Sequence, residues 1–213
     1  MIHAMKAPFQ NSIKLFMVML ATLLLAATVM AVPRPHAIPA RPELSFTPGP
    51  LRMYQSGENG RWYWYMTYVV ENGTGVDQIW APSLVMYTDK GEILNGGRKV
   101  PSAVTDEILE YVGDPLLEPQ YSIIGELKQG RGNARSGLVI WPAAKTNVNE
   151  LSIFVAGLSS DTIVVPHPKT GEDVVLRKTL QRDYLIPGDP TKRGDRVIDL
   201  APGMPRRPVW IYR

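Results

Sequence analysis

The chain has 213 residues, no cysteine and only three histidines, and its formal net charge at pH 7 is +3. The lack of cysteine excludes a thiol enzyme, a cysteine-ligated zinc or iron–sulfur centre and a lipid-modified cysteine. Three histidines, two of which precede residue 40, are too few for a histidine-cluster metal site.

Residues 1–31 have the pattern of a secretory signal peptide. Lys6 and Lys14 form a positive start, a long apolar run follows, and Val29-Met30-Ala31 offers small residues at the −3 and −1 positions of a cleavage site. The apolar run has about 18 residues, so an uncleaved membrane anchor is the alternative. Either outcome predicts an exported protein, periplasmic or extracellular. A cysteine-free exported chain of this size is more typical of a bacterium than of an animal.

The charge pattern argues against nucleic acid as a partner. Removal of Lys6 and Lys14 with the signal leaves 21 basic and 20 acidic residues, so the mature protein is nearly neutral. The charges are nevertheless uneven, because residues 100–127 contain six acidic and no basic residues, whereas residues 177–213 contain nine basic and four acidic ones. These blocks indicate two solvated faces, or two surfaces directed at different partners or at each other.

Residues 32–50 contain six prolines, which predict an extended spacer ahead of the folded part. A single domain is predicted for residues 51–213, with a C-terminal extension from about residue 187. Within it, turn residues separate short β-type runs at 51–55, 62–71, 83–88, 92–94, 121–124, 136–141, 151–158, 162–165 and 174–186. This order predicts an all-β sandwich or barrel.

Two segments bear on the helix content. The first, Ser102–Val112, is predicted to be a helix that is capped by Ser102 or Thr105 and ends at Gly113, with Asp106 and Glu107 near its positive end. The second, 174–186, fits a helix because apolar residues recur every four positions. We favour a strand there because the segment opens with two valines and its neighbours are β-type.

The stretch 62–71, WYWYMTYVVE, holds five aromatic residues in seven positions. Strand alternation puts Trp62 and Trp64 on one face, which predicts that this face points into the core. Tyr63 and Tyr65 lie on the other face, about 7 Å apart along the strand. They either form a platform that stacks on sugar rings or pack beneath a loop or the helix.

Other motifs carry weaker signals. Residues 130–137, GRGNARSG, lack the lysine of a phosphate-binding loop, so they predict a loop in which Arg131 and Arg135 are candidate contact residues. His167 is predicted to be a solvated turn residue. Asn72-Gly73-Thr74 is a glycosylation sequon in a eukaryote and a turn in a bacterium.

The acidic set Asp106, Glu107, Glu110 and Asp114 lacks the wrapping loop of a calcium site and predicts a solvated helix face. No metal and no cofactor are predicted.

Four segments, WYWYMTYVVENGTG, SGLVIWP, LSIFVAGLS and VVLRKTLQRDYLIPGD, resemble strands of exported immunoglobulin-like β-sandwich domains of bacteria. The resemblance covers about residues 60–190 and implies an immunoglobulin-like sandwich with one short helical insertion. It carries no functional residue over, and the Cys…Trp…Cys pattern of antibody domains is missing.

These features predict a non-catalytic interaction or structural module of the cell envelope or exterior. The expected partner is another envelope or extracellular protein, with polysaccharide as a further possibility and the membrane only through an uncleaved N-terminus. The alternatives are a carbohydrate-binding module that uses Tyr63 and Tyr65, and a hydrolase with an unidentified carboxylate pair.

Overall fold

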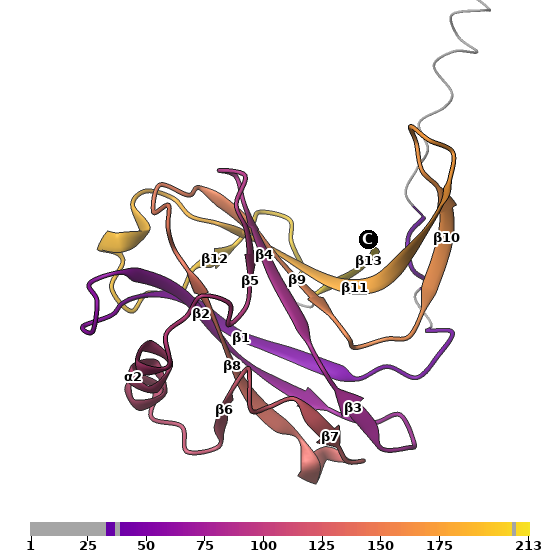
Figure 1. The fold of residues 1–213 in the computed structure, drawn as a ribbon, viewed down its shortest axis with the longest axis horizontal. Coiled ribbons are helices and arrows are strands. Elements are labelled where there is room, and N and C mark those ends of the chain that lie inside the picture. Colours follow the sequence, from indigo (N-terminus) through magenta and orange to yellow (C-terminus); the bar gives the residue numbers. More distant parts are fainter. Residues whose placement is uncertain (1–32, 37–38, 206–207) are drawn as a thin grey trace, which may run out of the picture. The chain divides into compact units, whose positions relative to one another are not determined.

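The computed structural model describes residues 33–36, 39–205 and 208–213, and it separates the chain into two units, residues 1–33 and 34–213. The signal sequence predicted for residues 1–31 lies outside the described residues. The second unit is an all-β sandwich with one short α-helix among its described residues, as predicted (Figure 1).

The first sheet has four strands in the order β1-β2-β8-β6. The β1–β2 and β2–β8 pairs are antiparallel, whereas β6 runs parallel to β8. The bounds of its strands are β1 Ser45–Gln55, β2 Trp62–Glu71, β6 Leu117–Pro119 and β8 Arg135–Pro142. The strands β1 and β6 are therefore the edges of this sheet.

The second sheet has the order β10-β11-β9-β4-β5, and β12 and β13 also pair with β11. Since Leu180 of β11 is opposite both Val155 of β9 and Trp210 of β13, these partners lie on opposite edges of β11. The bounds are β4 Ser83–Thr88, β5 Ile93–Asn95, β9 Glu150–Ala156, β10 Thr162–Pro166, β11 Asp173–Leu185, β12 Asp199–Leu200 and β13 Val209–Tyr212.

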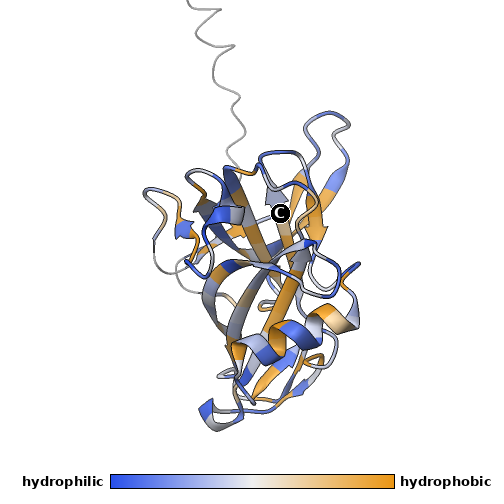
Figure 2. Cartoon of the chain, turned by 90° about the vertical axis from the view of Figure 1, so that its left-hand side faces the viewer, coloured by the Kyte–Doolittle hydropathy of each residue, from blue (hydrophilic) through white to orange (hydrophobic). Residues whose placement is uncertain are grey.

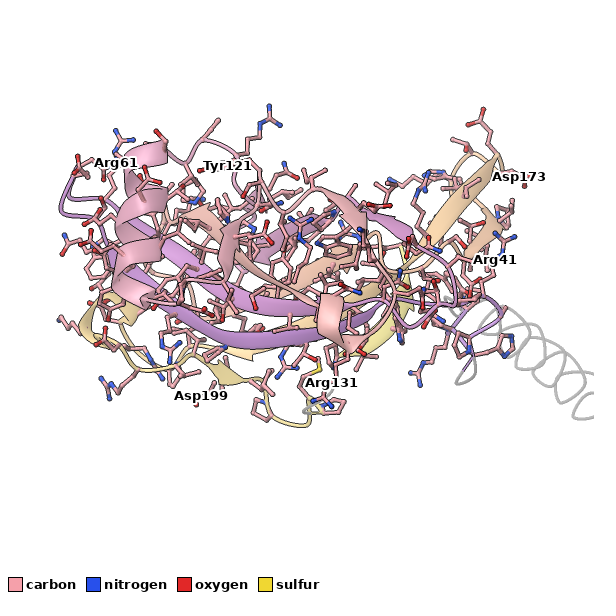
Figure 3. The ribbon with its side chains drawn as sticks, turned by 90° about the horizontal axis from the view of Figure 1, so that it is seen from below. Arg41, Arg61, Tyr121, Arg131, Asp173 and Asp199 are labelled. Atoms are coloured by element: carbon pink, nitrogen blue, oxygen red, sulfur yellow. The ribbon has the colours of Figure 1, made fainter. Side chains whose placement is uncertain are left out.

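Smaller elements complete the unit. β3 Gln78–Trp80 pairs with β7 Gly125–Leu127, and two short 3-10 helices, η1 and η2, span Arg131–Asn133 and Pro190–Lys192. The strand β10 and the first half of β11 form a projecting hairpin (Figure 1). Figure 3 shows Asp173 of this hairpin and Arg61 of the β1–β2 turn at opposite ends of the unit.

Both faces of β2 are buried, because the second sheet packs on one face and the helix on the other. One face contributes Trp64, Met66, Tyr68 and Val70 to the core between the two sheets, where Trp64 is opposite Trp141 of β8. Trp64 is fully buried, and Trp62 is half-buried against the same core. The predicted inward direction of this face is therefore confirmed, because alternation in β2 is regular.

The helix α2, Ser102–Val112, covers the other face of the first sheet and has the predicted bounds. Figure 2 shows it in front of strands with apolar segments. Gly113 ends it in the left-handed conformation, with φ at 68°, as expected for a glycine at this position.

The predicted cap of α2 is wrong. Pro101 occupies the N-cap position, no side chain caps the helix, and Asp106 and Glu107 lie beyond its first turn. Pro101 has the extended backbone of an N-cap residue, with φ at −62° and ψ at 146°, and its ring holds φ near that value, so the helix starts without Ser102 or Thr105 as a cap.

The domain begins earlier than predicted, because β1 starts at Ser45, within the stretch interpreted as a spacer over 32–50. Pro48 and Pro50 are tolerated since β1 is an edge strand and its register shifts between Pro48 and Leu51. Residues 121–124 form a turn and not the predicted strand, with Ile123 buried and Ile124 exposed.

The C-terminal region is part of the sandwich and not an extension from residue 187. β12 and β13 add to β11, and the backbone N–H of Ile198 donates to the carbonyl of Leu51 in β1 at 2.9 Å. The strands there have two and four residues, too short for a visible alternation among prolines and glycines. The segment 174–186, by contrast, is strand β11 as favoured.

Candidate functional site

Tyr63 and Tyr65 lie beneath the helix and not on an exposed face. Their side chains are 2% and 3% exposed and belong to the smaller core, together with Val104 and Ile108 of α2. The stacking platform predicted for the two tyrosines is therefore wrong, because a sugar ring would have to displace α2 to reach them. Their second predicted role, packing beneath the helix, is the one the structure shows.

The two candidate arginines of the loop 130–137 differ in their surroundings. Arg135 pairs with Glu118 of β6, with its Nε 2.8 Å from Oε1 and its Nη2 also in contact. The hydrogen bonds from Arg135 to Glu118 raise the pKa of the guanidinium. Arg135 therefore joins β8 to β6, whereas Arg131 is exposed in η1 and its predicted contact role stays a prediction.

The acidic residues of α2 also separate into two groups. Glu107 accepts hydrogen bonds from Ser56 Oγ, the Gly57 N–H and Tyr54 Oη at 2.6, 2.6 and 2.9 Å, which attaches the helix to the β1–β2 turn. The bond from Ser56, followed by those from Gly57 and Tyr54, lowers the pKa of the carboxyl. The hydrogen bonds to ionised Glu107 therefore stabilise the fold above the ordinary carboxyl pKa. This stabilisation is lost as the pH falls through the lowered pKa of Glu107.

Asp106 and Glu110 of the same helix are exposed. Among the described residues, no group of three or more His, Asp or Glu side chains is placed to hold a metal ion. His167 lies in the turn of the β10–β11 hairpin, where its Nδ1 accepts hydrogen bonds from the backbone of Lys169 and Thr170, so its predicted position in a turn is confirmed.

Asn72, which sequence reasoning treated as a turn residue, is a buried hub. Its side-chain amide donates to the carbonyls of Leu127 and Val76 at 2.7 and 2.9 Å, and its Oδ1 accepts from Thr74 and Gln129. The side chain is fully buried and both amide hydrogens are used. In the folded chain the sequon is therefore inaccessible, and Asn72 fixes the end of β2 to the strand β7.

We expect Asn72→Ala to lower the free energy of unfolding by about 1–3 kcal/mol, because it leaves the buried carbonyl of Leu127 without this donor and the N–H of Thr74 without its acceptor. Urea denaturation measures this change, and the exposed Asn95→Ala provides the matched control. Equal stability of the two variants would show that the hub contributes nothing to the fold.

A buried lysine anchors the segment that precedes β1. Lys178 of β11 is 2% exposed, and its Nζ lies 2.5 Å from Glu43 Oε1 and 3.8 Å from Asp161 Oδ2. The ring of Trp210 covers the amine, with its centroid 4.9 Å from Nζ. One positive charge thus compensates two largely buried carboxylates, an arrangement that no local sequence pattern could indicate.

A groove of about 640 Å³ lies beside this ion cluster, between the start of β1 and the strand β11. We call it the inter-sheet groove. Residues 43–48 form one wall, and the other consists of Leu180, Arg182, Pro208 and Trp210. Phe46, Leu180 and Trp210 make much of the lining apolar, while Glu43 supplies a carboxylate that is already paired with Lys178.

The groove runs along residues 45–48 of β1, opposite Pro208 and Trp210 of the C-terminal region. Further along β1, the backbone N–H of Ile198 donates to Leu51 O, and Arg52 Nε donates to Asp195 O at 3.2 Å. The groove opens beside residues 45–48, where Ser45 and Thr47 are exposed. An edge strand with an apolar wall opposite it is an arrangement suited to an extended chain.

The fold and the groove define the class of this protein as an all-β sandwich domain with one short helix and an open groove between its sheets. Compared with protein-family models, curated proteins and solved structures, the chain matches none. Among the described helices, none combines the length and the apolar character needed to cross a bilayer. The resemblance to exported immunoglobulin-like domains stays a prediction.

Proposed function

We propose that this domain is a non-catalytic interaction module of the cell envelope or exterior, and that it binds an extended segment of another protein in the inter-sheet groove. The observation that carries the proposal is the position of the groove beside an edge strand. Extended peptides bind such edges through main-chain hydrogen bonds, while neighbouring pockets accept alternate side chains. The apolar lining from Phe46, Leu180 and Trp210 supplies a pocket of that kind.

The chemistry of the groove favours binding over hydrolysis. Glycoside hydrolysis needs two opposed carboxyl groups, one of which acts as a general acid. Glu43 is the one carboxylate in the lining, and it lies 2.5 Å from the Lys178 amine. The signal-like pattern of residues 1–31 supports export, and hence a partner in the envelope or outside the cell.

Site-specific crosslinking tests the proposal. Because the chain has no cysteine, Thr47→Cys gives a single attachment point for a photocrosslinker within the groove. Gln55→Cys is the matched control, since Gln55 is exposed on the same strand but outside the groove. In an exporting bacterium we expect a discrete adduct with a different protein from position 47 and none from position 55.

A groove-filling variant makes the test sharper. Ser45→Trp places a large side chain at an exposed position that lines the groove, and we expect it to abolish the adduct from position 47 without unfolding the domain. Circular dichroism checks the fold of each variant. Equal adducts from both positions, or an adduct that Ser45→Trp leaves unchanged, would contradict a binding role for the groove.

A further inference from the structure

Two arginines lie side by side on the outer face of the second sheet. Arg177 of β11 donates its backbone N–H to the carbonyl of Arg213 at 2.8 Å, and Arg213 returns a bond of 3.2 Å. In such a hydrogen-bonded antiparallel pair the Cα atoms are about 5.5 Å apart and both side chains are on one face. Because Lys178 and Leu180 are buried, alternation directs Arg177 to the opposite, outer face.

The Arg213 guanidinium is held in place by two aromatic rings. Its Cζ lies 4.1 Å from the ring centroid of Phe154 and 4.7 Å from that of Tyr87, and it donates a hydrogen bond to the Tyr87 hydroxyl. Stacking of this kind fixes the planar fork before a ligand arrives. The guanidinium therefore covers one face of each ring.

The two guanidiniums line a shallow pocket of about 200 Å³, which includes Ser83 and Thr179. Among the ion pairs of the described residues, none involves Arg177 or Arg213. The two neighbouring guanidiniums carry like charges that repel each other, and a pair of side-chain carboxylates would relieve that repulsion through charge-assisted hydrogen bonds. The site is therefore suited to two carboxylates about as far apart as the arginines.

The helix α2 presents carboxylates with that spacing. Asp106 and Glu110 are exposed and four residues apart, which places their Cβ atoms about 5–6 Å from each other on one side of the helix. Glu107 is occupied by Ser56 and Gly57, so it does not compete. Within one copy the two sites cannot meet, because α2 covers the far side of the first sheet and the arginines lie outside the second.

We propose that the Arg177–Arg213 pair of one copy binds Asp106 and Glu110 of α2 in a second copy. The contact is heterologous, because one copy uses its arginine pair and the other its acidic helix. The first copy therefore keeps a free acidic helix and the second a free arginine pair, and further copies can bind to both. This inference goes beyond the proposed function, because its partner is a second copy of the chain. It uses a surface that is separate from the inter-sheet groove.

Charge reversal on each side tests the contact in the full chain. We expect the unchanged protein to self-associate in sedimentation velocity at low salt and to dissociate at high salt. Both R177E/R213E and D106K/E110K should be monomeric, with dissociation constants raised about tenfold or more. Lys128→Glu, at another exposed position, is the control that should leave self-association unchanged.

Mixing the two charge-reversed variants gives the decisive result. The first variant keeps its acidic helix and the second keeps its arginine pair, so the mixture should associate although neither variant does so alone, and the reversed glutamates and lysines are complementary as well. A protein that stays monomeric at low salt and millimolar concentration would overturn the proposal, as would a mixture without a complex. Self-association of D106K/E110K would show that α2 is not the occupant.

The outcome is independent of the crosslinking at the groove. If the sedimentation experiments show no self-association but the adduct from position 47 still forms, the contact between copies is rejected and the proposed function is not affected. Loss of that adduct with the association of the mixed variants intact would remove the groove as a binding site and leave the contact between copies.

Discussion

Trp64→Ala is expected to lower the free energy of unfolding by about 3–5 kcal/mol, the range for large aromatic side chains removed from a core. Trp64 is fully buried between the two sheets, opposite Trp141 of β8, so its removal leaves a cavity that rigid strands on both sides cannot fill. Urea denaturation, with the midpoint and the slope measured together, gives the change directly.

Trp62→Ala is the matched control, since Trp62 has the same chemistry and the same strand face but is only half-buried at the start of β2. We expect it to cost clearly less than Trp64→Ala. Equal losses for the two variants would contradict the account of β2 as a strand whose interior residues are enclosed by both sheets.

Lys178→Met is expected to lower the free energy of unfolding by about 3–5 kcal/mol, because it leaves the buried carboxylates of Glu43 and Asp161 without a positive charge. Arg41 Nε lies 4.0 Å from Asp161 but is largely exposed, so it offers little compensation. Thermal and urea denaturation at neutral pH measure the loss.

Removing all three charges of the Lys178, Glu43 and Asp161 cluster separates the effect of the lost positive charge from the effect of lost side-chain packing. Adding Glu43→Gln and Asp161→Asn to Lys178→Met removes the two carboxylate charges along with the amine, and we expect most of the stability to return. If the single variant is as stable as the unchanged protein, the lysine does not anchor the segment before β1. If the triple variant stays as unstable as the single one, lost packing against Trp210 explains the effect instead.

The sequence predicts the regular parts of this fold because they depend on local alternation. β2 is a run of aromatic and β-branched residues in which Trp and Tyr alternate at the start, and α2 has an apolar face followed by Gly113, so the bounds of each element follow from its own residues. The early start of β1 escapes prediction because its first residues include Pro48 and Pro50, which are tolerated only at a sheet edge.

The site is harder to predict because it depends on pairing between distant residues. The alternation of β2 separates Tyr63 from Trp64, but it does not reveal that a helix forty residues later covers the tyrosines. Asn72 has the sequence context of a turn, and its role emerges only when Leu127 and Gln129 are brought beside it. The inter-sheet groove likewise combines residues 43–48 with Leu180 and Trp210.

The strand β2 is enclosed on both faces, so its aromatic residues form core and not a ligand platform. Tyrosine nitration of the native protein, mapped by mass spectrometry, tests it within a single sample. Tyr121 is 66% exposed, whereas Tyr63 and Tyr65 are 2% and 3% exposed. We predict rapid modification of Tyr121 and protection of Tyr63 and Tyr65 until the domain unfolds. Modification of all three at similar rates in the folded protein would contradict it.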